Sequence, residues 1–202
     1  MFTLLTSQGS PYGRKVRLVA ALLGIEDKLK IQESSFRDPD DPIHKINPLS
    51  KIPALVPDGG APIFDSRVIC GYLCDRFDDG LVIPTDPDAR ARALTSAALA
   101  EGVCDALLLI VNESRFHEGE QISTAWLDHQ YRKVRRGLET AVANLDAFAA
   151  PGIAAVTLAC TLGYIDYRQQ LDWRAEFPAL QPWLDEFSAA VPAWDETKLP
   201  ES

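Results

Sequence analysis

The stretch NPLSKIPAL, from Asn47 to Leu55, is one of the most specific structural signals in this chain. It places Pro53 directly before a short apolar run, and an X-Pro bond can be cis at a cost of only about 0.5–1 kcal/mol. A cis bond at Ile52-Pro53 makes a tight turn that presents the main-chain N–H and C=O of Ile52 outward. Such a backbone can pair with an extended peptide as an added strand does. The stretch therefore predicts either a loop that binds a peptide-like ligand or an ordinary loop with a proline before a strand.

The residues that follow predict a hairpin and a helix. Ala54 to Val56 and Pro62 to Phe64 are short apolar runs separated by the turn signal PDGG, and we expect them to pair. Asp65 and Ser66 then begin an apolar helical pattern, where free N–H groups and the helix dipole favour a carboxylate. The carboxylate of Asp65 suits an ammonium group. Together the two residues fit the zwitterionic head of an amino acid, although an Asp-Ser pair in this position is also a plain helix cap.

Upstream of this stretch the chain alternates between strand and helix. Residues 2–6 form a short apolar run, and residues 11–23 carry apolar side chains at helical spacing before Gly24. Residues 29–32 then alternate apolar and polar side chains, which is typical of a strand. With the hairpin and the helix after it, the order is strand, helix, strand, strand, strand, helix.

The first helix begins with SPYGRKVR, residues 10–17. Pro11 suits the first helical position, so Ser10 is the predicted N-cap, and its hydroxyl lies at a helix N-terminus. Three cations follow in the first two turns, where the helix dipole disfavours them. Either they favour an anionic ligand, or they form salt bridges or a solvated face. They are Arg14, Lys15 and Arg17.

Beyond residue 80 the strand signals disappear. The segment 81–87 has the proline and aspartate content of a linker, and residues 88–116 predict one long helix interrupted at Gly102. Residues 127–148 step by four and three through a second helix, and residues 154–167 are almost wholly apolar, as in a buried helix. We therefore predict three parts: an α/β domain over residues 1–80, a linker over 81–87 and an all-helical domain over 88–202.

Composition excludes some partners. The formal net charge of −9 over 202 residues argues against nucleic acid and against an anionic membrane surface. We see no secretory signal and no window of about 18 apolar residues, so we expect no membrane span and a cytoplasmic protein. Four cysteines lie within helical patterns rather than loops, which favours reduced, buried thiols. The three histidines form no metal-binding motif, and we expect no metal.

The combination of these pieces resembles the glutathione S-transferase family over essentially the whole chain. NPLSKIPAL is similar to the family's cis-proline loop, and Asp65-Ser66 to the acidic-serine pair that begins its third helix. TLACTLGYIDYR resembles the family's buried helix and FPALQPWLDEF its final motif. The bacterial branches with SPY or SPF after the first strand are the most similar. The resemblance implies a thioredoxin-like N-terminal domain (βαβ-ββα) followed by an all-α domain.

This resemblance implies that the protein binds glutathione, whose γ-glutamyl head and cysteinyl peptide match the ligand features above. Ser10 then stabilises the thiolate as the catalytic residue, with Ser7 as the alternative donor, unless Ser10 only caps its helix. Lys51 and His44 are candidates for the glycyl carboxylate. Besides Ser10, the expected glutathione contacts are Lys51, Ile52, Pro53, Asp65 and Ser66.

The long helix adds two acidic candidates. Glu101 and Asp105 lie one turn apart on one polar stripe beside apolar positions. Family members commonly dimerise with this helix facing the other subunit's glutathione, which implies that Glu101 or Asp105 reaches the γ-glutamyl ammonium of a homodimer partner. Alternatively, the stripe is a solvent-exposed face of the helix, which is kinked at Gly102.

The departures from the family bear on the reaction. A cysteine at position 10 would allow a mixed disulfide, and serine cannot form one, so we expect conjugation of glutathione to a small hydrophobic electrophile. Phe116, Trp126 and Tyr164 are candidate walls for that electrophile. Since the fold also serves proteins without enzymatic activity, a non-catalytic ligand-binding or regulatory protein is the alternative.

Overall fold

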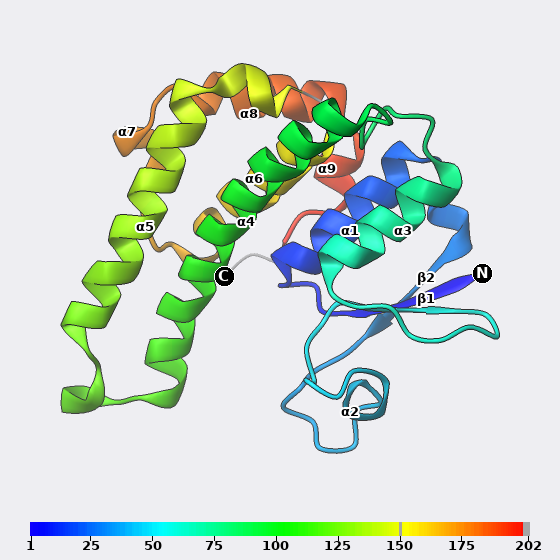
Figure 1. Ribbon diagram of the computed structural model, residues 1–202. Coiled ribbons are helices and arrows are strands. Elements are labelled where there is room, and N and C mark those ends of the chain that lie inside the picture. The colour runs from blue at the N-terminus through cyan, green and yellow to red at the C-terminus, as the bar shows by residue number, and fades with distance from the viewer. Residues whose placement is uncertain (150, 200–202) are drawn as a thin grey trace.

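The computed structural model describes residues 1–149 and 151–199 and contains a small sheet beside an array of helices (Figure 1). Residues 150 and 200–202 of the predicted helical domain lie outside the described residues. In the sheet, β1 (Phe2–Thr6) lies between β2 (Leu29–Glu33) and β3 (Ala54–Pro57). β2 runs parallel to β1 with Phe2 opposite Leu29, and β3 runs antiparallel with Phe2 opposite Pro57.

The second arm of the expected hairpin is shorter than predicted. Of residues 62–64, only Ile63 pairs, in one antiparallel bridge with Leu55 whose two N···O distances are 2.8 and 2.9 Å. Because Pro62 has no N–H, it cannot donate to a longer ladder. Residues 62–64 therefore form a bridge at the sheet edge and not a full strand.

Helices α1 (Pro11–Leu22) and α3 (Ser66–Phe77) cover one face of the sheet, and the short α2 (Ile43–Ile46) lies on the other side (Figure 1). Successive residues of β1 point to opposite faces. Leu4 accordingly packs into the core beneath α1 and α3, whereas Leu5 packs against Ile43 and Ala54. This arrangement is the predicted thioredoxin-like domain.

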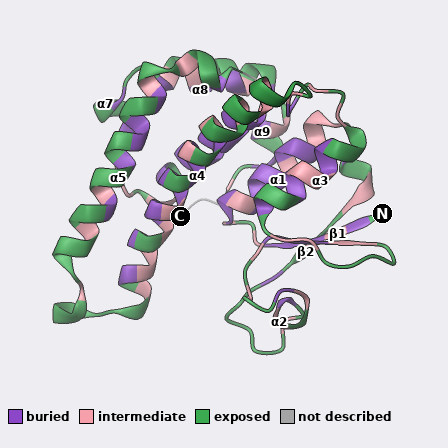
Figure 2. Cartoon of the chain, in the orientation of Figure 1, coloured by how far each residue is buried: buried purple, intermediate pink, exposed green. Residues whose placement is uncertain are grey.

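The remaining chain is helical. The long α4 (Pro87–Phe116) and α5 (Thr124–Ala143) form a hairpin (Figures 1 and 2). α6 (Ile153–Arg168) is buried over most of its length and packs against α1 and α4. α4 runs through Gly102 without interruption, so the predicted break is wrong. The short helices are α7 (Trp173–Glu176), α8 (Leu180–Ala190) and α9 (Ala193–Glu196), with single 3₁₀ turns η1 (Glu26–Lys28), η2 (Gly119–Gln121) and η3 (Leu145–Phe148).

By length and composition alone α4 could cross a membrane, which corrects the expectation that no such window exists. Its most apolar window has a mean hydropathy of 1.8, and 44% of that window is buried inside the protein. The buried side packs against α5 and α6. The apolar composition of α4 therefore has an explanation inside the fold, as a core helix.

The α1 helix connects the sheet with the helical array. On one side, a Cβ added at Gly13 would overlap the Thr6 side chain of β1, so glycine permits this close approach. On the other side, Arg14 lies 3.4 Å from the centre of the Trp194 ring and donates to the Trp194 carbonyl at 2.7 Å. Two neighbouring residues of α1, Gly13 and Arg14, thus contact the sheet and the C-terminal helix α9, respectively.

Candidate functional site

Ser10 lies at the N-terminus of α1, as predicted. Its backbone is extended (φ −87°, ψ 115°), and its Oγ accepts the N–H of Gly13 at 3.1 Å. A hydroxyl has two lone pairs and one proton, and among the described residues nothing accepts the proton of Ser10. Capping therefore uses the oxygen as an acceptor and leaves its O–H free to donate. The alternative donor, Ser7, is half-buried, and its carbonyl accepts the N–H of Ser10 at 3.1 Å.

The loop before β3 is fixed by Asn47, which is buried. Its side-chain amide donates to the Lys51 carbonyl at 2.8 Å and accepts the N–H of Leu49 at 3.0 Å. The Ile52–Pro53 bond is cis, which confirms that prediction. Within the described part of the chain, no group hydrogen-bonds to the main chain of Ile52. The loop thus presents an unpaired backbone N–H and C=O.

The two candidates for a terminal carboxylate differ. The Lys51 residue is exposed and makes no ion pair with a described residue. His44 is engaged through both ring nitrogens, with Ser50 Oγ and the Asp38 carbonyl each at 2.8 Å. Lys51 is therefore the one of the two with a free side chain.

The N-terminus of α3 carries the acidic-serine pair. Asp65 is exposed, and its Oδ1 accepts the N–H of Arg67 at 2.9 Å. The Oγ of Ser66 donates to Glu101 at 3.1 Å, while the Ser66 N–H donates to no described residue. A carboxylate can therefore still be bound by this N–H group.

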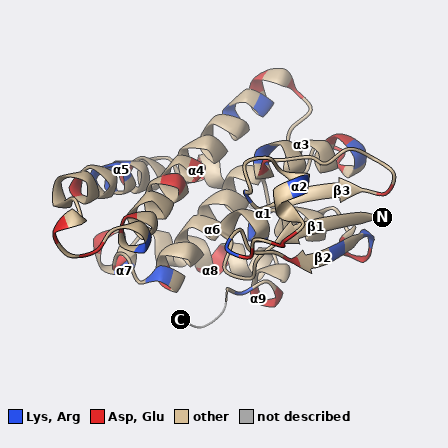
Figure 3. Cartoon of the chain, turned by 90° about the horizontal axis from the view of Figure 1, so that it is seen from below, with Lys and Arg blue, Asp and Glu red and all other residues tan. Residues whose placement is uncertain are grey.

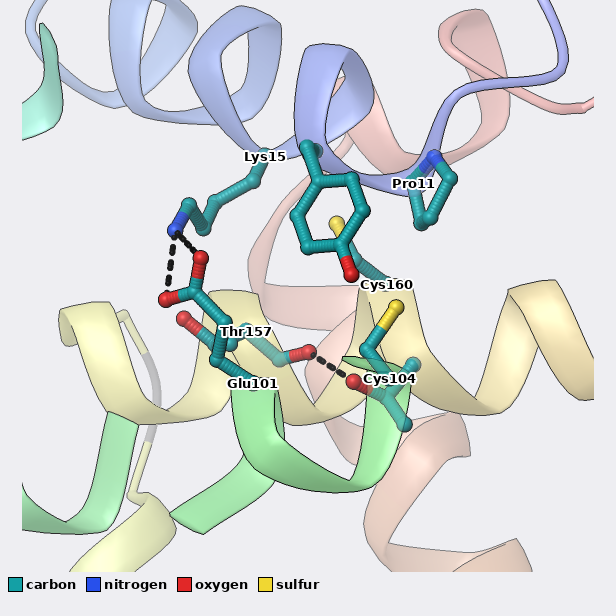
Figure 4. Close-up of a pocket in the computed structure, with 8 residues that line it drawn as sticks. Pro11, Lys15, Glu101, Cys104, Thr157 and Cys160 are labelled. Atoms are coloured by element: carbon teal, nitrogen blue, oxygen red, sulfur yellow. Dashed lines mark hydrogen bonds and ion pairs between the residues drawn. The ribbon is translucent and has the colours of Figure 1, made fainter. Parts of the chain in front are cut away.

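Glu101 lies inside the protein and takes three donors from its own chain. Both of its carboxylate oxygens lie 3.0 Å from Lys15 Nζ (Figure 4). Ser66 Oγ and Arg67 Nε, at 3.1 and 3.2 Å, complete the set. With only 4% of Glu101 exposed, its carboxylate is not presented to a second subunit in the way the polar stripe suggested. The ion pair with Lys15 also accounts for one of the α1 cations.

Asp105, one turn later, keeps 48% of its side chain exposed. Its Oδ1 accepts the Tyr12 hydroxyl at 2.5 Å, and its Oδ2 lies 3.3 Å from Arg67 Nη2. Burial, together with the nearby Cys104 and Asp105, raises the pKa of Tyr12, so this hydroxyl stays protonated and donates. Tyr12 and Arg67 were not among the predicted site residues. Their positions directly beside the Ser-Pro and Asp-Ser motifs were the available signal.

A small pocket lies between α1, α4 and α6 (Figure 4). Its wall includes Pro11, Tyr12, Cys104 and Cys160. Burial raises the pKa of the Cys160 thiol to about 12 and also raises that of Cys104. Both thiols are protonated at neutral pH and are poor nucleophiles.

The other predicted groups are dispersed. Phe116 and Trp126, 67% and 40% exposed, lie at the α4–α5 end of the molecule, whereas Tyr164 is buried in α6. The three do not form one wall. Among the described residues, no group of three or more His, Cys, Asp or Glu side chains could hold a metal ion.

Comparison with known proteins identifies related sequences and structures. Residues 9–76 match the model of the glutathione S-transferase N-terminal domain, and residues 124–186 match that of the C-terminal domain. A glutathione transferase family member from Pseudomonas fluorescens Pf-5, solved with bound glutathione, is 38% identical with a TM-score of 0.92, over 99% of this chain and 100% of that one. The same protein has been solved with S-(propanoic acid)-glutathione (38% identical, TM-score 0.88, the same coverage).

Two further relatives extend the comparison. A glutathione S-transferase from Methylobacillus flagellatus KT, solved with glutathione, is 34% identical with a TM-score of 0.91, over 99% of this chain and 100% of that one. The uncharacterized GST-like protein YibF of Escherichia coli K12 is 29% identical over 82% of this chain and 83% of its own. On this evidence, the chain belongs to the glutathione S-transferase family.

Proposed function

We propose that this protein is a glutathione transferase in which Ser10 stabilises the thiolate of glutathione. The observation that carries the proposal is the Ser10 hydroxyl, which caps α1 with its oxygen and has no described acceptor for its proton. A free thiol has a pKa of about 8.5 and is mostly protonated at pH 7. A donated hydrogen bond and the helix N-terminus both favour the thiolate.

We assign the rest of glutathione to protein groups that have no hydrogen-bond partner among the described residues. The main chain of Ile52, in the loop fixed by cis Pro53, pairs with the cysteinyl unit, and Lys51 binds the glycyl carboxylate. At the start of α3, the Ser66 N–H binds the γ-glutamyl carboxylate and Asp65 its ammonium. Glu101 supports this end by holding the Ser66 hydroxyl and Arg67 in place.

In the reaction, the sulfur of the thiolate forms a bond to an electrophilic carbon of a small, largely apolar substrate. In a substitution the leaving group departs with its electron pair, and in an addition the resulting carbanion takes up a proton. The relative solved with S-(propanoic acid)-glutathione binds a conjugate of this kind. Glutathione is therefore a co-substrate, and this scheme uses no metal.

We further propose a cytoplasmic homodimer in which residues 1–80 bind glutathione, residues 81–87 are the linker and residues 88–202 contribute the electrophile site. Val68 on α3 and Leu94 on α4 are 55% and 40% exposed. Two large apolar side chains on these helices favour an interface. Asp105, half exposed beside Arg67, would face the partner's γ-glutamyl ammonium.

The experiment compares conjugation of glutathione to 1-chloro-2,4-dinitrobenzene by Ser10→Gly, Ser7→Gly and the unaltered protein. Glycine is nearly as good an N-cap as serine, so Ser10→Gly removes the hydroxyl and leaves the helix start intact. We expect a decrease in kcat of about tenfold or more for Ser10→Gly, since a hydrogen bond to a charged group contributes about 1.5–3 kcal/mol. Unchanged kcat in Ser10→Gly with a loss in Ser7→Gly would transfer the role to Ser7.

The second candidate is a non-catalytic glutathione-binding protein. It is favoured by the low exposure of Ser10, 7%, which limits access of a bulky electrophile. Retention on immobilised glutathione without turnover across a broad panel of electrophiles would support it over the transferase.

A further inference from the structure

An arginine-tyrosine cluster combines side chains from the end of α4 and from the last turns of α6. It consists of Arg115 at the end of α4 and of Tyr164, Tyr167 and Arg168 in the last turns of α6. The Arg168 guanidinium carbon lies 4.3 Å from the centre of the Tyr167 ring and 5.5 Å from that of Tyr164. The two rings lie 6.4 Å apart. Tyr164 is only 1% exposed, so Tyr167 supplies the aromatic surface of the cluster and the arginines its positive charge.

Tyr167 connects this cluster to the catalytic candidate. A Cβ added at Gly9 would lie 3.0 Å from the Tyr167 hydroxyl, so the ring lies against the residue that directly precedes Ser10. An electrophile that reacts with a thiolate held by Ser10 must lie close to that serine. The cluster is therefore next to the place where the second substrate reacts.

The cations of the cluster have no carboxylate partner within the described ranges, in a chain with 29 acidic and 20 basic residues. Among the described residues, Arg115 donates only to the amide oxygen of Asn112, at 3.4 Å, and Arg168 Nε is buried without an acceptor. The neighbouring Glu113 is engaged with His117 and with the N–H of Ser123. An unpaired buried N–H is costly, and an anionic ligand would satisfy it.

The positive charges of the arginines also repel one another. Burial lowers the pKa of Arg115, and Arg168 and Arg37 lower it further. Arg37 belongs to the exposed loop between β2 and α2, whose acidic residues are red in Figure 3. Of those, Asp41 is bound to Ser34 and to the N–H groups of Ser35 and Ile43. Like charges held together in this way are stabilised by an anion between them.

We propose that the electrophilic substrate carries a carboxylate, which Arg168 and Arg115 bind while its apolar part lies against Tyr167. The inference rests on the proposed function and names its substrate class. Arg168 also hydrogen-bonds the Tyr164 side chain, but a purely apolar electrophile site would not require two guanidinium groups that lack a carboxylate partner among the described residues. Guanidinium binds carboxylate through two parallel hydrogen bonds, a geometry that lysine does not offer.

The test is the binding, by calorimetry, of two S-substituted glutathiones that differ only by a carboxylate: S-(4-carboxybenzyl)glutathione and S-benzylglutathione. We expect the carboxylated compound to bind the unaltered protein about tenfold more tightly, the equivalent of one charge-assisted hydrogen bond. Arg168→Gln and Arg115→Gln should each remove most of this preference and change the affinity for S-benzylglutathione by less than about twofold. Arg132→Gln, an exposed arginine on α5, is the matched control and should leave both affinities unchanged.

Each outcome separates the two claims. Equal affinity for the two compounds, or a preference that survives both arginine substitutions, overturns the carboxylate proposal and leaves the transferase intact. Failure to bind glutathione and both derivatives overturns the proposed function, and the carboxylate proposal with it. Thermal unfolding of each variant checks that a loss reflects binding and not misfolding.

Discussion

The charged side chain of Lys15 is buried, with only 4% of it exposed. Its Nζ forms an ion pair with a carboxylate oxygen of Glu101 at 3.0 Å. Removing one member of a buried ion pair leaves the other uncompensated, and the usual cost is about 3–5 kcal/mol. Glu101 would retain Arg67 and Ser66. We therefore expect Lys15→Met to reduce the free energy of unfolding by about 3 kcal/mol, the lower end of that range.

Urea denaturation measures this loss. Lys30→Met, at an exposed position of β2, is the matched control and should change stability by less than about 0.5 kcal/mol. The double variant Lys15→Met/Glu101→Gln should recover part of the loss. A Lys15→Met protein as stable as the control would show that the pair contributes nothing.

The four cysteines are buried and free, and they provide a pH-dependent prediction. Burial raises the pKa of Cys70 to about 11 and that of Cys160 to about 12. The folded protein therefore keeps these protons at a pH where the unfolded chain, with a thiol pKa of about 8.5, has lost them. These groups favour folding fully below pH 8.5, and that contribution is lost as the pH rises toward 11 and 12.

Labelling with a thiol-specific disulfide reagent tests this. At pH 8 we expect no rapid reaction in the folded protein and reaction of all four thiols after unfolding in urea, because the thiolate is the nucleophile. Fast modification of Cys70 or Cys160 in the folded protein would contradict their assigned environment.

At the scale of elements, the packing of α1 on β1 depends on Gly13. A Cβ there would overlap the Thr6 side chain, whereas a Cβ at Gly102 in α4 meets nothing within 4 Å. We expect Gly13→Ala to destabilise the fold by about 1–3 kcal/mol through overpacking. Gly102→Ala should stabilise it by about 0.5–1 kcal/mol, because alanine loses less backbone entropy in a helix. Thermal and urea unfolding measure the stability of both variants. Equal stability of the two alanine variants would contradict this explanation.

The elements that the sequence predicted best are those with strong local signals. Ser10-Pro11 marks the start of α1, Asp65 caps α3, and the apolar run after Gly152 is the buried α6. The errors arose where tertiary contacts decide. Gly102 lies inside a helix held by its neighbours, so its low helix propensity does not end α4.

The residues of the candidate site likewise separate into those that the local sequence predicts and those that it does not. Motif residues such as Ser10, Ile52 and Asp65 are predictable because each has a local backbone role. The partners of Glu101 are not, because Lys15 is 86 residues away along the chain. Whether an acidic stripe is solvated, shared or internally paired depends on such distant contacts, and helical spacing alone carries no information about them.

At the scale of the whole molecule, the exposed apolar residues on α3 and α4 predict assembly. We expect Val68→Asp to shift the protein toward a monomer, because it places a charge within an apolar interface. Phe116→Asp, at the 67% exposed end of α4, is the control and should stay dimeric. Sedimentation equilibrium measures the mass against twice the 22.2 kDa of one chain. A monomeric unaltered protein would contradict the proposed interface.

Stabilisation of the glutathione thiolate by Ser10 lowers the thiol pKa of bound glutathione, and a titration of the complex measures this pKa. Thiolate absorbance near 240 nm, titrated against pH in the saturated complex, gives that pKa without any electrophile. We predict a value at least about one unit below the free thiol's 8.5 for the unaltered protein and for Ser7→Gly. In Ser10→Gly the value should return close to 8.5. A thiol pKa that is not lowered, or one that is lowered equally in Ser10→Gly, would contradict the claim.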